Sequence, residues 1–193
     1  MKHFKLAILF AVCAFSVTLE AAKTKEKILM GIVSNHTRVF GVDDLFKAPI
    51  DFAPWNAMTK EAEAFVRANA QNDKSILIAL NRVLAQNDDL ITTMITARSQ
   101  TTGGIQAQDR DKLLATFKSI ASQAQDSENT LKRMSLALTS KKEAREVLTQ
   151  LAMFVGTTAT AASNHLTKKL ASPPKKALPA TPAAKPAAKA AKT

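Results

Sequence analysis

The residues that most often perform acid-base or metal chemistry are sparse in this chain and far apart. Beyond the first few residues, the only histidines are His36 and His165, which are separated by 129 positions. An imidazole used as a general base or a metal ligand is usually recognised by a short spacing such as HExxH, and neither histidine has one. No glycine-rich phosphate loop and no GxSxG turn occurs either. Residues scattered along a chain can still meet in a folded site, but the sequence favours a protein that is not an enzyme and predicts no catalytic residue and no cofactor.

Acidic and thiol groups give no metal site at the sequence level. Asp43, Asp44 and Asp51 lie close together, but their spacing lacks the central glycine and the terminal glutamate of a calcium loop. Cys13 is the single cysteine and lies inside an apolar run, where lipidation is a minor alternative because the run continues past it. The sequence after position 22 therefore predicts no disulfide and no metal ion.

The first 22 residues have the three-part pattern of a secretory signal peptide. A cationic MKHFK precedes the apolar run LAILFAVCAFSVTL, and small residues follow before a polar stretch. As a helix this run spans roughly 21 Å, less than the roughly 30 Å of a bilayer core, which favours a cleaved signal over an anchor. We expect cleavage after Ala21 or Ala22 and export to the periplasm, the envelope or the medium. An uncleaved anchor and a buried N-terminal helix are the alternatives.

Positive charge is concentrated at the C-terminus. The whole chain carries a net charge of +11. Residues 23–167 contain 18 Lys and Arg against 15 Asp and Glu, whereas residues 168–193 contain seven lysines and no acid. The attraction to polyanions that a basic chain implies therefore belongs to the tail and not to the body.

The tail over 171–193 reads ASPPKKALPATPAAKPAAKAAKT. Its five prolines prevent a long helix, and its composition predicts a disordered segment of extended conformation. We interpret its lysines and the two at its root as a diffuse anion-binding set. That set comprises Lys168, Lys169, Lys175, Lys176, Lys185, Lys189 and Lys192.

This tail resembles the Ala/Lys/Pro tails of linker histones and of some bacterial nucleoid proteins, a likeness that implies nucleic acid as the partner. The export signal conflicts with that partner, and similar stretches also serve as spacers in envelope proteins. The sequence therefore favours weak binding to an anionic envelope polymer or to lipid headgroups. A nucleic-acid-binding protein is the alternative, and a solvating tail without a partner is the third interpretation.

Residues 23–55 are predicted to be mostly irregular, with a short helix at 42–47, because glycine and proline interrupt them often. This segment carries Phe40, Phe46, Phe52 and Trp55. These rings are interpreted either as a hydrophobic lid on the bundle or as the partner surface of a secreted adaptor or chaperone-like module. We favour the lid.

Residues 56–170 are predicted to form the helical domain. Two stripes of residues step by four and three for about three repeats each, and Gly103-Gly104 between them lets the chain reverse into an antiparallel hairpin. Asn87 and Ser127 interrupt the stripes and are expected to reach a neighbour or water. The first stripe comprises Ile76, Leu80, Val83, Asn87, Leu90, Met94 and Ala97, and the second comprises Leu113, Phe117, Ile120, Ala124, Ser127, Leu131, Met134 and Leu138.

Two more helices complete the predicted bundle. The capping box Ser140–Glu143 starts one of them, and its uncharged stretch 147–167 contains enough polar residues to favour burial in protein over a membrane span. Thr59–Ala70 is the other, and it either breaks before the first stripe or continues into it. The fold class predicted is all-α, an antiparallel bundle of three or four amphipathic helices. Heptads of this length also suit pairing between chains, so a homo-oligomer stays open.

Overall fold

A computed structural model describes residues 25–41, 45–46, 50–101 and 107–171. Within these residues the chain is all-helical, as predicted, but it forms five helices and not three or four. The first covers 25–40, and the others are α2 (Ala53–Ala70), α3 (Lys74–Thr101), α4 (Ala107–Arg133) and α5 (Thr139–Ala171). The predicted signal peptide at 1–22 and the tail from 172 onward lie outside the described residues.

Helix 25–40 corrects the prediction of an irregular segment. Gly31, one of the glycines on which that prediction depended, lies within the helix, and a Cβ there would be 2.6 Å from the Sδ atom of Met58. Because Met58 is part of α2, this glycine allows α2 to pack closely against helix 25–40. Ile28 and Ile32 are buried at helical spacing. The predicted short helix at 42–47 falls largely outside the described residues, and residues 45–46 form a turn.

Helix α2 begins six residues before the predicted start at Thr59. Pro54 lies in its first turn, where a helix needs no amide donor, and the Oδ1 atom of Asp51 accepts a hydrogen bond of 2.9 Å from the amide of Ala53. The helix ends at Ala70, and the next two residues have positive φ angles of 48° and 62°. The chain therefore breaks before α3, which was one of the two alternatives left open.

The connection between α4 and α5 differs in detail from the predicted pattern. Helix α4 ends at Arg133, so Met134 and Leu138 of the second stripe lie beyond it, and Leu138 is 49% exposed. The Nη1 atom of Arg145 donates a hydrogen bond of 2.8 Å to the carbonyl of Met134 and holds this connection against α5. Helix α5 begins at Thr139, which places Ser140 inside its first turn and not at the predicted cap position.

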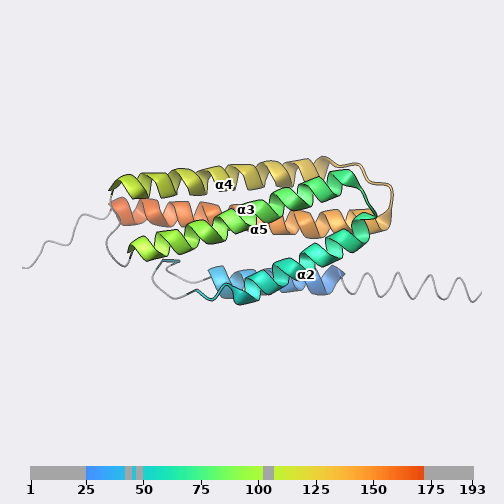
Figure 1. The fold of residues 1–193 in the computed structure, drawn as a ribbon, viewed down its shortest axis with the longest axis horizontal. Coiled ribbons are helices and arrows are strands. Elements are labelled where there is room, and N and C mark those ends of the chain that lie inside the picture. Colours follow the sequence, from blue (N-terminus) through green and yellow to red (C-terminus); the bar gives the residue numbers. More distant parts are fainter. Residues whose placement is uncertain (1–24, 42–44, 47–49, 102–106, 172–193) are drawn as a thin grey trace, which may run out of the picture.

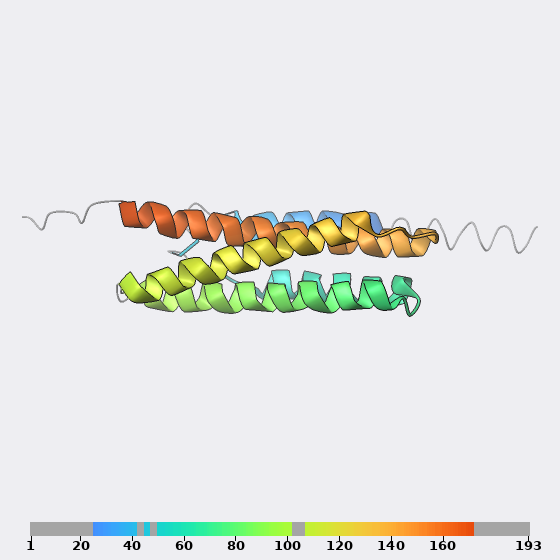
Figure 2. The same ribbon diagram turned by 90° about the horizontal axis from the view of Figure 1, so that it is seen from above.

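The five helices lie side by side with α5 in contact with all the others (Figure 1). Neighbours α2 and α3, α3 and α4, and α4 and α5 are antiparallel (Figures 1 and 2). Helix 25–40 is parallel to α5, because Lys25 pairs with Glu146 at 3.0 Å and His36 bonds to Thr158 at 2.7 Å. The antiparallel order predicted for residues 56–170 is therefore seen in α2 to α5, and helix 25–40 is an additional helix that was not predicted.

Helices α4 and α5 approach closely at Gly156. A Cβ on this glycine would lie 3.3 Å from the Cβ of Ala124, so small residues on both helices set the distance between them.

The polar residues of α5 are consistent with a helix packed in protein. Among the described helices, none combines the length and the apolar character that crossing a bilayer requires.

Replacing Gly156 with leucine should force α4 and α5 apart and lower the free energy of unfolding by at least about 1 kcal/mol, despite the better helix propensity of leucine. Urea unfolding followed by circular dichroism measures this change. Ala161→Leu, at an exposed position of the same helix, is the matched control and should shift stability by less than about 0.5 kcal/mol. Equal effects of the two substitutions would contradict the close contact.

Candidate functional site

The predicted anion-binding lysines lie at or beyond the end of α5. Lys168 is exposed in the last turns of that helix, and Lys169 follows it in the helix. The other five, Lys175, Lys176, Lys185, Lys189 and Lys192, are outside the described residues. The structure therefore locates the root of the tail and leaves its binding role as a prediction.

The aromatic residues considered as a partner surface belong mostly to the core. Phe40, Phe46 and Trp55 are 7%, 4% and 0% exposed, and Phe52 is half-buried. The rings of Phe40 and Trp55 meet edge to face at 5.4 Å, and Phe46 lies 6.3 Å from the ring of Phe117 in α4. This placement favours the lid interpretation, because the rings fill the bundle and offer little surface to a partner.

His36 joins the same aromatic cluster from helix 25–40. Its imidazole lies 4.2 Å from the ring of Phe154 and 5.9 Å from that of Trp55, measured between centroids. Its Nε2 atom shares a hydrogen bond of 2.7 Å with the Oγ1 atom of Thr158. Burial lowers the pKa of His36 from 6.5 to about 4, because the charged ring would lose its hydration. His165 is far along α5, with its ring 5.4 Å from Phe46, so the two histidines belong to separate environments.

A buried hydrogen bond links this cluster to α3. The Nε1 atom of Trp55 donates to the Oδ1 atom of Asn87 at 2.7 Å, and the two residues are 0% and 2% exposed. Asn87 is the polar interruption of the first stripe, and it reaches a neighbouring side chain, as expected. The interruption of the second stripe behaves alike, since Ser127 accepts a hydrogen bond of 3.0 Å from Gln86.

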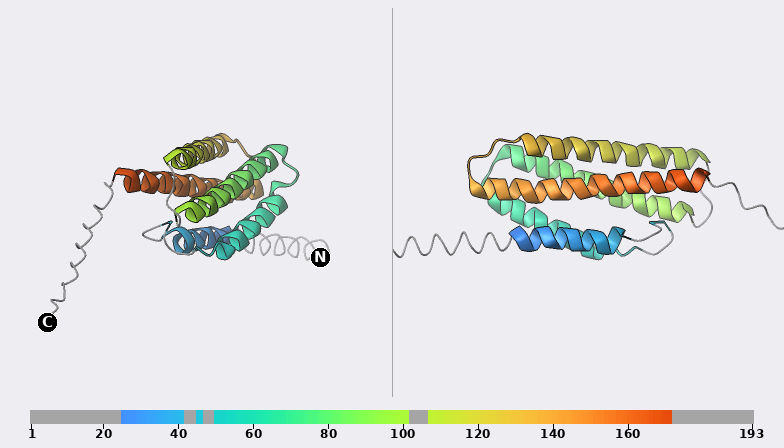
Figure 3. Two further views of the ribbon diagram at one scale, coloured as in Figure 1. Left: turned by 60° about the vertical axis from the view of Figure 1, so that its left-hand side comes forward. Right: turned by 180° about the vertical axis from the view of Figure 1, so that it is seen from behind.

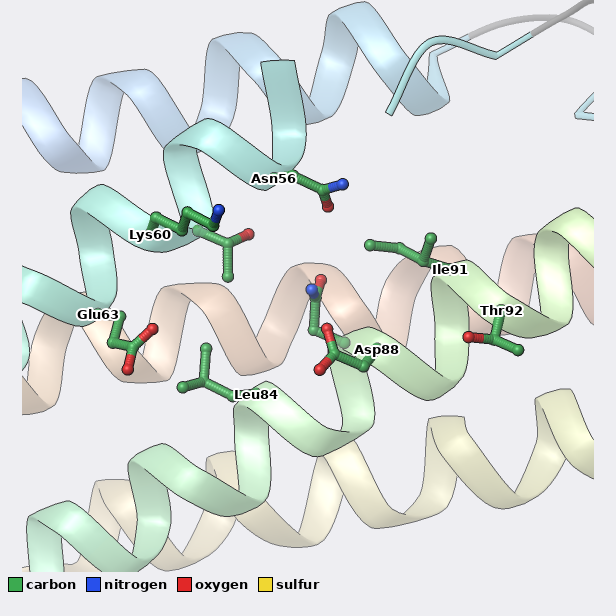
Figure 4. Close-up of a pocket in the computed structure, with 9 residues that line it drawn as sticks. Asn56, Lys60, Glu63, Leu84, Asp88, Ile91 and Thr92 are labelled. Atoms are coloured by element: carbon green, nitrogen blue, oxygen red, sulfur yellow. The ribbon is translucent and has the colours of Figure 1, made fainter. Parts of the chain in front are cut away.

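A cleft opens beside Asn87, between α2 and α3 (Figure 4). Its volume is about 420 Å³. Asn56, Thr59, Lys60 and Glu63 line it from α2, and Leu84, Asn87, Asp88, Ile91 and Thr92 line it from α3. Figure 4 shows Lys60 and Glu63 on one wall and Asp88 with Ile91 on the other. The size is within the usual range for small-molecule sites.

The charges of the cleft are mixed. The Oε1 atom of Glu63 accepts a hydrogen bond of 2.8 Å from the Nε atom of Arg67, one turn further along α2. Lys60 and Asp88 have no ion-pair partner within the part of the chain that the structure describes. A cation and an anion thus face a shared space, together with the carboxamide groups of Asn56 and Asn87.

This cleft was not predicted from the sequence. Its polar residues come from two helices that read separately as amphipathic, and their meeting depends on how α2 packs against α3. The one signal was Asn87, a polar residue at a position where the heptad pattern calls for an apolar one.

A metal site does not emerge from the described residues, in which no three His, Cys, Asp or Glu side chains gather at a distance suited to an ion. Comparison with known proteins adds no family: neither a protein-family model nor a curated protein nor a solved structure matches the chain.

Breaking the Trp55–Asn87 bond should destabilise the bundle. Asn87→Leu leaves the buried indole N–H without an acceptor, which costs about 1–3 kcal/mol of unfolding free energy. Trp55→Phe should cost less in the Asn87→Leu background than in the original chain, because the donor is then already unpaired. Urea unfolding of the two single variants and the double variant measures this coupling. Asn56→Leu, exposed in the same cleft, is the control, and purely additive effects at Trp55 and Asn87 would contradict the bond.

Acid should weaken the fold through His36. The unfolded imidazole takes up a proton near pH 6.5 and the folded one only near pH 4, so the unfolded chain binds more protons between these values. The free energy of unfolding should therefore fall as pH decreases from about 6.5 to about 4. Urea unfolding across this range checks the slope, and His36→Gln should flatten it.

The carboxylate of Asp73 titrates at a lower pH than His36 does. Hydrogen bonds from Ser75 and Lys141 lower the pKa of Asp73 from 3.8 to about 2, so its contribution is present above pH 3.8 and is lost as pH falls toward 2. The pH ranges in which the two groups affect stability can therefore be separated.

If the free energy of unfolding of His36→Gln fell between pH 6.5 and 4 as steeply as that of the original chain, His36 would not be the cause.

Proposed function

We propose that this chain is an exported, non-enzymatic helical-bundle protein that its basic tail tethers to an anionic surface of the cell envelope. The observation that carries the proposal is the partition of charge: residues 168–193 hold seven lysines and no acid, while residues 23–167 have 18 basic against 15 acidic side chains. A nearly neutral body with a strongly cationic extension suits attraction by the extension alone.

Ion pairs of the body support this division of roles. Lys25, Lys132 and Lys141 pair with Glu146, Glu128 and Asp73, so several of its cations are already used within the fold. The lysines of the tail have no acidic neighbour in sequence. They are therefore the cations best suited to bind polyanions.

The end of α5 supports a tether that extends away from the bundle. The C-terminal end of α5 lies at the end of the bundle opposite to the α4–α5 connection and to the start of helix 25–40 (Figure 3). A proline-rich chain of the tail's length reaches roughly 70 Å at about 3.1 Å per residue. Near an anionic membrane each lysine contributes about 1 kcal/mol before screening, so several together give reversible binding without a shaped pocket.

Removing residues 168–193 should abolish co-sedimentation with vesicles that contain anionic phospholipid, at low salt. The full chain should bind such vesicles, bind vesicles of neutral phosphatidylcholine far less, and be released as salt rises toward about 0.5 M because exposed charges are screened. A variant with all seven tail lysines changed to glutamine separates the effect of charge from that of length.

Two outcomes would overturn the tether. One is undiminished sedimentation of the deletion or the glutamine variant. The other is a location inside the cell with an intact N-terminus, which fractionation and N-terminal sequencing detect; together with salt-sensitive binding to duplex DNA, it would favour the nucleic-acid alternative.

A further inference from the structure

The cleft between α2 and α3 presents a hydrogen-bond donor whose direction the fold determines. Asn87 is 2% exposed and lines the cleft. Its oxygen must face Trp55, because an indole N–H can only donate. The amide nitrogen is thereby turned away from the tryptophan, and no described residue accepts its hydrogens. A buried carboxamide aimed at open space in this way is suited to the oxygen of a ligand.

Charged side chains on the two walls define the rest of the site. Lys60 lines the cleft from α2, and Asp88 lines it from α3 (Figure 4). Since Glu63 is bonded to Arg67, the groups left for a ligand are one ammonium and one carboxylate. A ligand with a single charge would leave one of them unmatched, whereas a ligand with both charges matches both.

Apolar side chains border the same space. Leu84 and Ile91 on α3 are both half-buried and line the cleft. They lie on either side of Asp88 along the helix and offer contact to a small hydrocarbon group. Polar groups that fix orientation beside an apolar wall are the usual composition of a small-molecule site.

We propose that this cleft binds a small zwitterion of the amino-acid class. The carboxylate of the ligand accepts hydrogen bonds from the Nδ2 atom of Asn87 and from the ammonium of Lys60. The ammonium of the ligand donates to the carboxylate of Asp88, and an apolar substituent lies against Leu84 and Ile91. This site is separate from the tail and does not depend on the proposed tether.

The test uses L-leucine and two analogues that each lack one charge, 4-methylpentanoate without the ammonium and 3-methylbutylamine without the carboxylate. Chemical-shift titration of the full chain should show L-leucine perturbing residues of α2 and α3 around the cleft. Each analogue should bind about 10-fold or more weakly, since one charged hydrogen bond is lost. Glycyl-leucine in a parallel titration distinguishes a short peptide from a free amino acid as the source of the zwitterion.

Two substitutions test which side chain binds the ammonium of the ligand and which binds its carboxylate. Asp88→Asn should weaken L-leucine binding about 10-fold but should not weaken the binding of 4-methylpentanoate, because that analogue has no ammonium to pair with Asp88. Lys60→Gln should weaken L-leucine binding similarly but should not weaken the binding of 3-methylbutylamine, which has no carboxylate to pair with Lys60. Both side chains are exposed, so the fold should persist, which circular dichroism verifies. Asp89→Asn, exposed on α3 but outside the cleft, is the matched control and should bind L-leucine normally.

Either of two results would overturn the proposal. The first is the absence of cleft perturbation by both L-leucine and glycyl-leucine up to about 10 mM, a concentration that detects even millimolar affinity. The second is an equal loss of binding in Asp88→Asn and Asp89→Asn, which would indicate a general effect of acidic charge and not a site.

Discussion

The hydrogen bond between Trp55 and Asn87 is the constraint on which the arrangement of this bundle depends. It is fully buried, and it joins the first turn of α2 to the middle of α3. An indole N–H without an acceptor is costly in a core, so the two helices cannot slide past each other without a penalty. The same bond fixes the orientation of the Trp55 ring, which His36 and Phe40 of helix 25–40 contact, so this helix is positioned by it as well.

A second buried hydrogen bond, between Gln86 and Ser127, fixes α3 relative to α4. Gln86 and Ser127 connect α3 to α4, and both are buried. Gln86 and Asn87, which are adjacent in α3, thus form hydrogen bonds to two different helices: Asn87 to α2 and Gln86 to α4. Apolar heptads alone tolerate shifts by a whole repeat, because one leucine packs much like the next. Two directional bonds at one level remove that freedom and favour a single alignment.

The helices with long apolar stripes could be predicted from sequence, while their start and end points and their partners could not. The stripe from Ile76 to Ala97 lies wholly in α3, because a periodic pattern over three repeats leaves little alternative. Helix 25–40 was missed, because Gly31 lowers helix propensity locally and the sequence does not show that Met58 would pack over it. Burial of Ile32 outweighs that local cost. The cleft was missed for the same kind of reason, since it depends on contacts between α2 and α3 that neither segment encodes alone.

The parallel alignment of helix 25–40 with α5 has a mechanical consequence. The N-terminal end of helix 25–40 and the C-terminal end of α5 lie at opposite ends of the bundle (Figure 3). Tension applied between these two points pulls the adjacent helices lengthwise in opposite directions, so their contacts are strained in shear and not peeled apart one at a time. The pairs Lys25–Glu146 and His36–Thr158, which span the contact, would have to yield together. A bundle connected in this way resists stretching along its long axis better than one in which both points lie at the same end.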